Sequence, residues 1–117
     1  MAIRFAPVAK VTDDVPIQMM REDGEYDDGD LRVTFKMESN SKFQELMTKI
    51  GNEEKTDKEV LRDRVLNVEG VLDADGNERE FSKALVGELA DDPDTGPALI
   101  QHWIRLQTRR DKEAAKN

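Results

Sequence analysis

Apolar and polar side chains alternate along two stretches near the start of the sequence. Along residues 30–37, one face carries Leu31, Val33, Phe35 and Met37, and the other carries Arg32, Thr34 and Lys36. This period of two predicts a strand. Residues 15–21 alternate similarly, and Pro16 is typical of the start or edge of a strand. The two stretches predict an antiparallel hairpin, joined by a loop at 22–30 that holds six acidic residues and no basic one.

A helical period follows the hairpin. The spacing of one helix face recurs at Phe43, Leu46, Met47 and Ile50. Ser41 and Gln44 match a capping box, so we expect this helix to begin at Ser41 and to end near Gly51.

The pattern in residues 58–72 is compatible with either a helix or a strand. Gly70 is unfavourable inside both elements. We favour a short helix that ends near Arg64, followed by a strand from Val65 to Leu72. Residues 73–77, with the sequence Asp-Ala-Asp-Gly-Asn, are typical of a turn.

Two further helices are expected in the last third of the chain. Ser82 is the candidate N-cap of the first helix, which ends before Pro93 because the residue preceding a proline resists helical geometry. Asp94 or Thr95 is the candidate cap of the second. The apolar stripe of the first helix comprises Leu85, Val86 and Leu89. The apolar face of the second comprises Leu99, Ile100, Trp103 and Ile104.

These elements predict a single α+β domain over residues 1–107. The N-terminal antiparallel hairpin, with a third strand, would pack on three or four α-helices. Residues 1–14 are expected to form an irregular or extended arm. Residues 108–117 are polar, with four basic and two acidic side chains, and are expected to form a frayed C-terminal tail.

The charge of the chain narrows the classes of partner. The net charge is −8, from 18 basic and 26 acidic residues, which disfavours binding to nucleic acid or to an anionic membrane surface. No apolar run approaches the roughly 18 residues that span a bilayer, and the first residues lack the pattern of a signal peptide. The chain has no cysteine and therefore no disulfide or thiolate metal site. We expect a cytosolic protein.

Candidate chemistry is sparse. His102 is the only histidine, and the simplest interpretation is a partly exposed residue of the last helix. One histidine without cysteine disfavours a transition-metal site. Residues 73–76 resemble the start of a calcium loop, but the glycine follows two candidate ligands instead of three. We therefore expect no catalytic residue, no metal ligand and no cofactor. The acidic loop at 22–30 is either a solvated loop or a site for a cation or a basic partner.

Three blocks of sequence occur in a particular order. The first comprises residues 15–17, 21–26 and 31–36 (VPI, REDGEY and LRVTFK), and the second comprises residues 65–71 (VLNVEGV) with the turn at Asp75 and Gly76. The third runs from Phe81 and Ser82 through Leu85, Leu89, Asp92 and Pro93 to residues 97–99. Together these blocks, over roughly residues 10–107, resemble the small tail assembly chaperones of long-tailed phages.

The resemblance implies a phage or prophage protein that acts in the cytoplasm of the bacterial host and is absent from the mature virion. Its partner would be the tape-measure protein, a long apolar helical protein that it binds transiently and keeps soluble during tail assembly. The resemblance further implies contact with the tail tube protein through a longer frameshift product, and it allows a homo-oligomer. It supplies no binding residues for this chain.

The residues themselves suggest a binding surface. We expect the last two helices to offer an apolar surface made of Leu85, Leu89, Leu99, Trp103 and Ile104, because tryptophan is enriched at binding hot spots and a groove between helices can cover an apolar helix. The alternative is that Trp103 packs in the core against Phe81 and Leu85.

Two other functions remain open at this point. One is a structural head–tail or tail completion protein of the virion, which would be found in purified particles. The other is an acidic inhibitor of a host protein, which would need carboxylates spaced like phosphates on one face.

Overall fold

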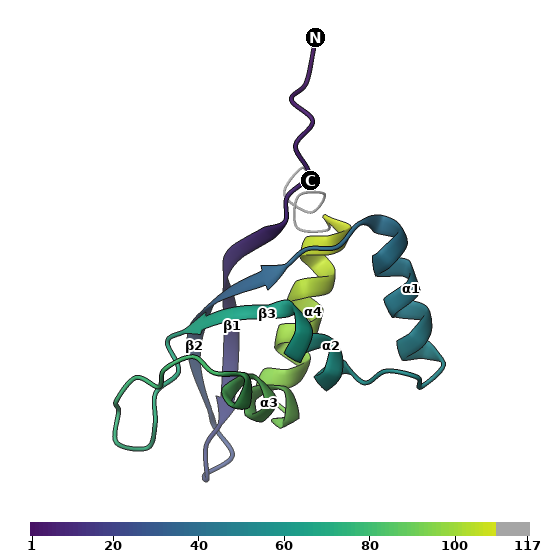
Figure 1. Cartoon of the computed structure of the whole chain (residues 1–117). Coiled ribbons are helices and arrows are strands. Elements are labelled where there is room, and N and C mark those ends of the chain that lie inside the picture. Colours follow the sequence, from purple (N-terminus) through teal and green to yellow (C-terminus); the bar gives the residue numbers. More distant parts are fainter. Residues whose placement is uncertain (110–117) are drawn as a thin grey trace.

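The computed structural model describes residues 1–109 of the chain, which form a three-stranded antiparallel sheet and four helices in an α+β arrangement (Figure 1). In chain order the elements are β1 (Lys10–Met20), β2 (Tyr26–Lys36), α1 (Asn40–Gly51), α2 (Asp57–Arg64), β3 (Val65–Glu69), α3 (Lys83–Asp91) and α4 (Thr95–Thr108). The expected fold class is confirmed.

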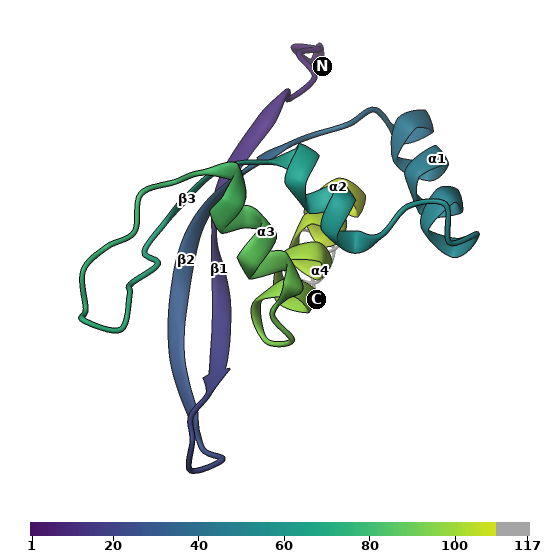
Figure 2. The same ribbon diagram turned by 60° about the horizontal axis from the view of Figure 1, so that its bottom comes forward.

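The sheet has the strand order β1-β2-β3, and the helices lie on one side of it (Figure 2). The hairpin register places Val15 opposite Leu31, and the pairing of β2 with β3 places Val33 opposite Val68. All four side chains are buried. The alternation along residues 31–37 therefore follows the buried face of the sheet, as predicted.

The hairpin is longer than the alternation predicts. β1 begins at Lys10 instead of residue 15, and β2 begins at Tyr26 instead of residue 30. The additional residue pairs are held by the strand pairing of β1 with β2. A hydrogen bond between the Thr12 and Thr34 hydroxyl groups, with 2.7 Å between the oxygens, adds to it. A strand with polar side chains on both faces lacks the alternation of apolar and polar residues, so a hydrophobicity pattern does not predict it. The expected arm at 1–14 is thus corrected to residues 1–9.

The expected acidic loop at 22–30 shrinks to a tight turn at 21–25, because its second half belongs to β2. Asp23 organises this turn. Its carboxylate accepts from the backbone N–H of Glu25 at 2.9 Å and from the Arg21 guanidinium. The hydrogen bond from the Glu25 N–H, and after it those from Arg21, lower the pKa of Asp23 below its ordinary value. The turn therefore keeps this stabilisation at neutral pH and loses it as the pH falls through the lowered pKa.

Residues 58–72, whose pattern is compatible with a helix or a strand, contain the favoured helix followed by the favoured strand. α2 is capped by Thr56 and ends at Arg64, and β3 begins directly at Val65. β3 ends at Glu69, earlier than the expected Leu72, because Gly70 adopts a positive φ of 99° that turns the chain away from the ladder. The turn at 73–77 is confirmed, since Asp73 Oδ1 accepts from the backbone N–H groups of Asp75 and Asn77.

The expected helix starts are confirmed for α3 and α4 and displaced for α1. Ser82 caps α3 as expected. α1 is capped by Ser39 instead of Ser41, because the Ser39 hydroxyl accepts from the N–H of Lys42. At α4, Asp94 occupies the N-cap position as expected, but its side chain makes no capping hydrogen bond. The carboxylate of Asp92 instead accepts from the N–H groups of Asp94 and Thr95, at 2.9 Å each.

Gly96 lets α4 start against the end of α3. A Cβ at this position would lie 2.5 Å from the carbonyl oxygen of Ala90, which is backbone and cannot swing away. We expect Gly96→Ala to destabilise the domain by about 1–3 kcal/mol, measured by urea unfolding. The matched control is Gly51→Ala, where nothing lies within 4 Å of the added methyl group. This control should leave stability unchanged or raise it slightly. Equal stability of the two variants would contradict the close approach at Gly96.

The core lies between the sheet and α1–α4. Its largest fully buried side chains are Trp103 and Phe35. Thr108 is the last residue of α4, and residues 110–117 lie outside the described part, so the frayed tail remains a prediction.

Candidate functional site

The five residues expected to form the binding surface are mostly core. Leu85, Leu99 and Trp103 are 1%, 0% and 0% exposed, and Leu89 is also buried. Only Ile104 is partly accessible. The expected apolar surface on the last two helices is therefore corrected, because four of its five residues belong to the hydrophobic core of the domain. A partner could not reach most of them in the folded domain.

Trp103 packs in the core, as the alternative to a binding anchor predicts. Its indole ring meets Phe43 edge to face, with ring centroids 5.4 Å apart. Its Nε1–H donates to the carbonyl oxygen of Lys36 at 3.1 Å. The tryptophan thus joins α4 to α1 and to the end of β2.

His102 is buried, which corrects the expectation of a partly exposed residue. Its Nε2–H donates to Asp13 Oδ2 at 2.9 Å, and its ring stacks on Phe35 with centroids 6.1 Å apart. Asp13 lies 89 residues away in the sequence, on the strand that the hydrophobic pattern missed. The contact joins α4 to β1, which is a structural role.

The exposed large apolar side chains of the described residues, Leu66 excepted, gather at two places. One is the arm, residues 1–9, with Ile3 and Phe5 each 85% exposed. The other is the far end of the hairpin and the segment beside it, with Met19, Met20, Tyr26 and Leu72. Exposed apolar side chains that cluster mark candidate interaction surfaces.

An apolar groove lies at the hairpin end, between the helix-facing side of the hairpin and the segment after β3. We call it the hairpin groove; it has a volume of about 450 Å³. Its apolar lining comprises Ile17, Met19, Leu31, Val71, Leu72 and Leu89. Met19 is 39% and Leu72 is 62% exposed, so the groove is open to a partner.

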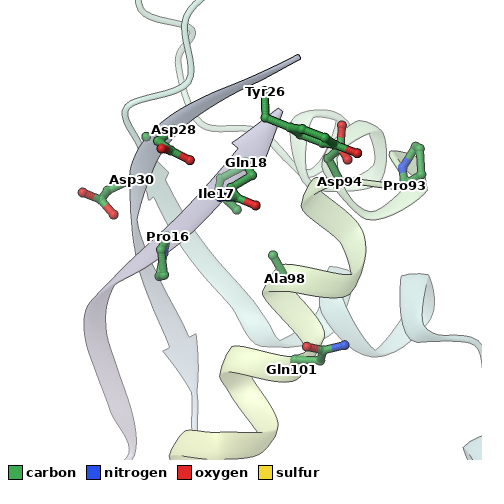
Figure 3. A pocket seen from close by; sticks show the side chains of 11 residues that line it. Pro16, Ile17, Gln18, Tyr26, Asp28, Asp30, Pro93, Asp94, Ala98 and Gln101 are labelled. Atoms are coloured by element: carbon green, nitrogen blue, oxygen red, sulfur yellow. The ribbon is translucent and has the colours of Figure 1, made fainter. Parts of the chain in front are cut away.

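A second pocket lies at the free edge of β1, against α4 (Figure 3). We call it the edge pocket; it has a volume of about 730 Å³. Pro16 and Gln18 line it from β1, and Ala98 and Gln101 line it from α4. Tyr26 extends across its upper end toward Asp94 and Pro93 (Figure 3). The edge pocket is thus more polar than the hairpin groove.

Both depressions are acidic. Asp28 and Asp30 line each of them, Asp27 adds to the groove and Asp94 adds to the edge pocket. Neither has a lysine or arginine in its lining. Arg21, in the hairpin turn, is paired with Asp23 and Asp27. Apolar walls with a carboxylate rim favour a ligand that combines apolar and basic side chains.

The described residues carry neither a metal cluster nor a membrane-spanning helix. Within residues 1–109, no group of three or more His, Asp or Glu side chains is placed to hold a metal ion. In the same range, no helix has the length and apolar character needed to cross a membrane.

The hydrophobic pattern of the sequence predicts neither depression, although the hairpin pattern contains one relevant signal. Pro16 and Gln18 point away from the buried face in the hairpin pattern, opposite Asp30 and Asp28. Pro16, expected at a strand edge, does mark the free edge of β1. The contribution of α4 to that edge depends on tertiary packing and has no counterpart in the local pattern.

Comparison with family models, curated proteins and solved structures found no match for this chain.

Proposed function

We propose that the protein is a tail assembly chaperone of a long-tailed phage or prophage. It binds the tape-measure protein transiently and keeps it soluble in the cytoplasm of the bacterial host while the tail forms. It acts by binding alone, without catalysis or a cofactor. It is not retained in the mature virion.

The observation that carries this proposal is the convergence of the three resembling blocks on one groove. Ile17 and Leu31 come from the first block, Val71 comes from the second, and Leu89 comes from the third. These residues are far apart in the sequence and line the same apolar depression. The part of the chain that resembles the chaperones therefore builds the place best suited to hold an apolar segment.

The charge of the domain supports the same proposal. A segment of the tape-measure protein would place its apolar side chains against the groove, and the net charge of −8 would keep the complex in solution. The acidic rim favours a bound segment with lysine or arginine beside its apolar stripe. Contact with the tail tube protein would belong to a longer frameshift product.

Groove variants test the proposal by co-expression with the tape-measure protein from the same phage genome. We expect Met19→Asp combined with Leu72→Asp to reduce the co-purified tape-measure protein about tenfold or more, because each carboxylate would be desolvated against an apolar segment. Both residues are exposed, so the fold should survive. The control is Leu66→Asp, at an apolar residue of β3 outside the groove that is 40% exposed, close to the 39% of Met19.

Two results would contradict the proposal. One is a tape-measure protein that stays equally soluble without this chain. The other is full co-purification with the groove variant. Purified particles provide a further check, since a head–tail or tail completion protein would be present in them and a chaperone would not.

A further inference from the structure

The arm has a chemistry unlike the rest of the domain. The arm, residues 1–9, contains Arg4 and no acidic residue, and Lys10 follows it as the first residue of β1, in a chain whose net charge is −8. Ile3, Phe5 and Val8 are 85%, 85% and 52% exposed, so the arm buries almost none of its apolar surface on its own domain. Among the described residues, neither Arg4 nor Lys10 forms an ion pair. Such a segment is suited to a surface elsewhere that is apolar and acidic.

The edge pocket has the complementary chemistry. Pro16, Tyr26, Pro93 and Ala98 supply apolar contacts, and Asp28, Asp30 and Asp94 are the acidic residues of the lining (Figure 3). Within residues 1–109, none of the three carboxylates is in an ion pair. An arginine placed among them would make charge-assisted hydrogen bonds.

The edge pocket also offers backbone groups to an extended segment. Met37 N–H donates to the Ala9 carbonyl, so the backbone groups of Ala9 face β2. In contrast, Met20 N–H points away from β2 and donates to Asp94. Because peptide groups alternate along an antiparallel strand, the groups of Gln18 face the free edge of β1 as those of Met20 do. Pro16 lies on the same side, where its missing N–H costs no ladder bond. An extended chain can therefore pair with this edge.

The arm and the edge pocket of one molecule lie toward opposite ends. The arm continues from the start of β1, and the pocket lies near the hairpin turn at the other end of that strand (Figures 1 and 2). We propose that the arm of one copy binds in the edge pocket of a second copy, with Arg4 among the carboxylates and Phe5 or Ile3 on the apolar wall. The interface joins two different surfaces, so copies associate head to tail.

The negative charge of each copy opposes this association but does not prevent it. At physiological ionic strength the screening length is about 8 Å, so repulsion between distant charges of two copies is largely screened. The contacts of the arm are local and partly desolvated, and they are screened less. The proposal concerns self-association alone and is independent of the tape-measure protein.

The test uses sedimentation equilibrium over a concentration series of the full chain and of three variants. We expect concentration-dependent association of the full chain. We expect about a tenfold or larger loss of self-affinity on deletion of residues 1–9, in Ile3→Ser with Phe5→Ser, and in Asp28→Lys with Asp30→Lys. The matched control is Glu54→Lys with Glu80→Lys, which changes the net charge equally at two exposed sites outside the pocket.

A mixing experiment makes the test specific for the head-to-tail arrangement. The copy without residues 1–9 keeps its edge pocket, and the copy with Asp28→Lys and Asp30→Lys keeps its arm. Each alone should be monomeric, and the mixture should form a 1:1 heterodimer and nothing larger. A monomeric full chain at every concentration, unchanged association of the arm-deleted copy, or a mixture without heterodimer would each overturn the proposal. None of these results would bear on co-purification of the tape-measure protein through the hairpin groove.

Discussion

Replacement of Trp103 by alanine is expected to remove about 3–5 kcal/mol of folding stability. The indole is fully buried, packs edge to face on Phe43, and donates to the Lys36 carbonyl oxygen. The substitution leaves a large cavity between α1 and α4 and an unpaired carbonyl group at the end of β2. Since a domain of this size has roughly 5–15 kcal/mol in total, the loss is a large fraction of its stability.

Thermal and urea unfolding both measure this effect. A loss of 1 kcal/mol lowers the Tm of such a domain by roughly 4–8 °C, so Trp103→Ala should melt at least about 12 °C below the parent chain. Trp103→Phe is the intermediate variant, because it keeps an aromatic ring and loses the hydrogen bond to Lys36. Leu66→Ala is the exposed control and should change stability by less than about 0.5 kcal/mol. If Trp103→Ala were as stable as Leu66→Ala, the tryptophan could not occupy the core.

Removal of the Glu38 side chain is the second large effect. Arg64 is 5% exposed, and its Nη2 lies 3.2 Å from Glu38 Oε1, which is itself nearly buried. The Arg64 Nε has no hydrogen-bond partner among the described residues, and the contact with Glu38 is ionic without hydrogen-bond geometry. Asp63 approaches Arg64 at 3.5 Å but is well exposed and compensates little. We expect Glu38→Ala to cost about 3–5 kcal/mol in urea unfolding, because a buried guanidinium loses its partner.

The paired variant separates the loss of an interaction from the cost of an unpaired charge. Glu38→Leu with Arg64→Met removes both charges and keeps apolar volume at both positions. A buried ion pair replaced by apolar side chains is often neutral in stability, so this variant should recover most of the loss seen in Glu38→Ala. A double variant that is less stable than either single variant would show that the pair itself stabilises the fold.

The expected instability of core variants affects how a loss of partner binding is interpreted. Trp103, Leu99 and Leu85 are core residues, and a variant at any of them that lost a partner would do so through unfolding. The groove residues Met19 and Leu72, and the arm residues Ile3 and Phe5, are exposed and can be changed with little effect on the fold. Interaction tests therefore belong at the hairpin end and at the arm.

The sequence by itself determined the local elements. The alternation along residues 31–37 lies on the buried face of β2, and the boundary between Arg64 and Val65 separates a helix from a strand. Ser82 caps α3, and Asp73 closes the turn before it. In each case neighbouring residues act on one another, so a short window of sequence contains the cause.

Only the tertiary structure decided which apolar side chains are available to a partner. A helix shows one apolar stripe whether that stripe meets a core or a ligand, and here Leu85, Leu99 and Trp103 are buried in the core. The same packing joined Asp13 to His102 across 89 residues and revealed a strand in polar sequence. It also brought Ile17, Val71 and Leu89 to one groove. Contacts between residues distant in the chain depend on how the elements pack, and no local pattern records that packing.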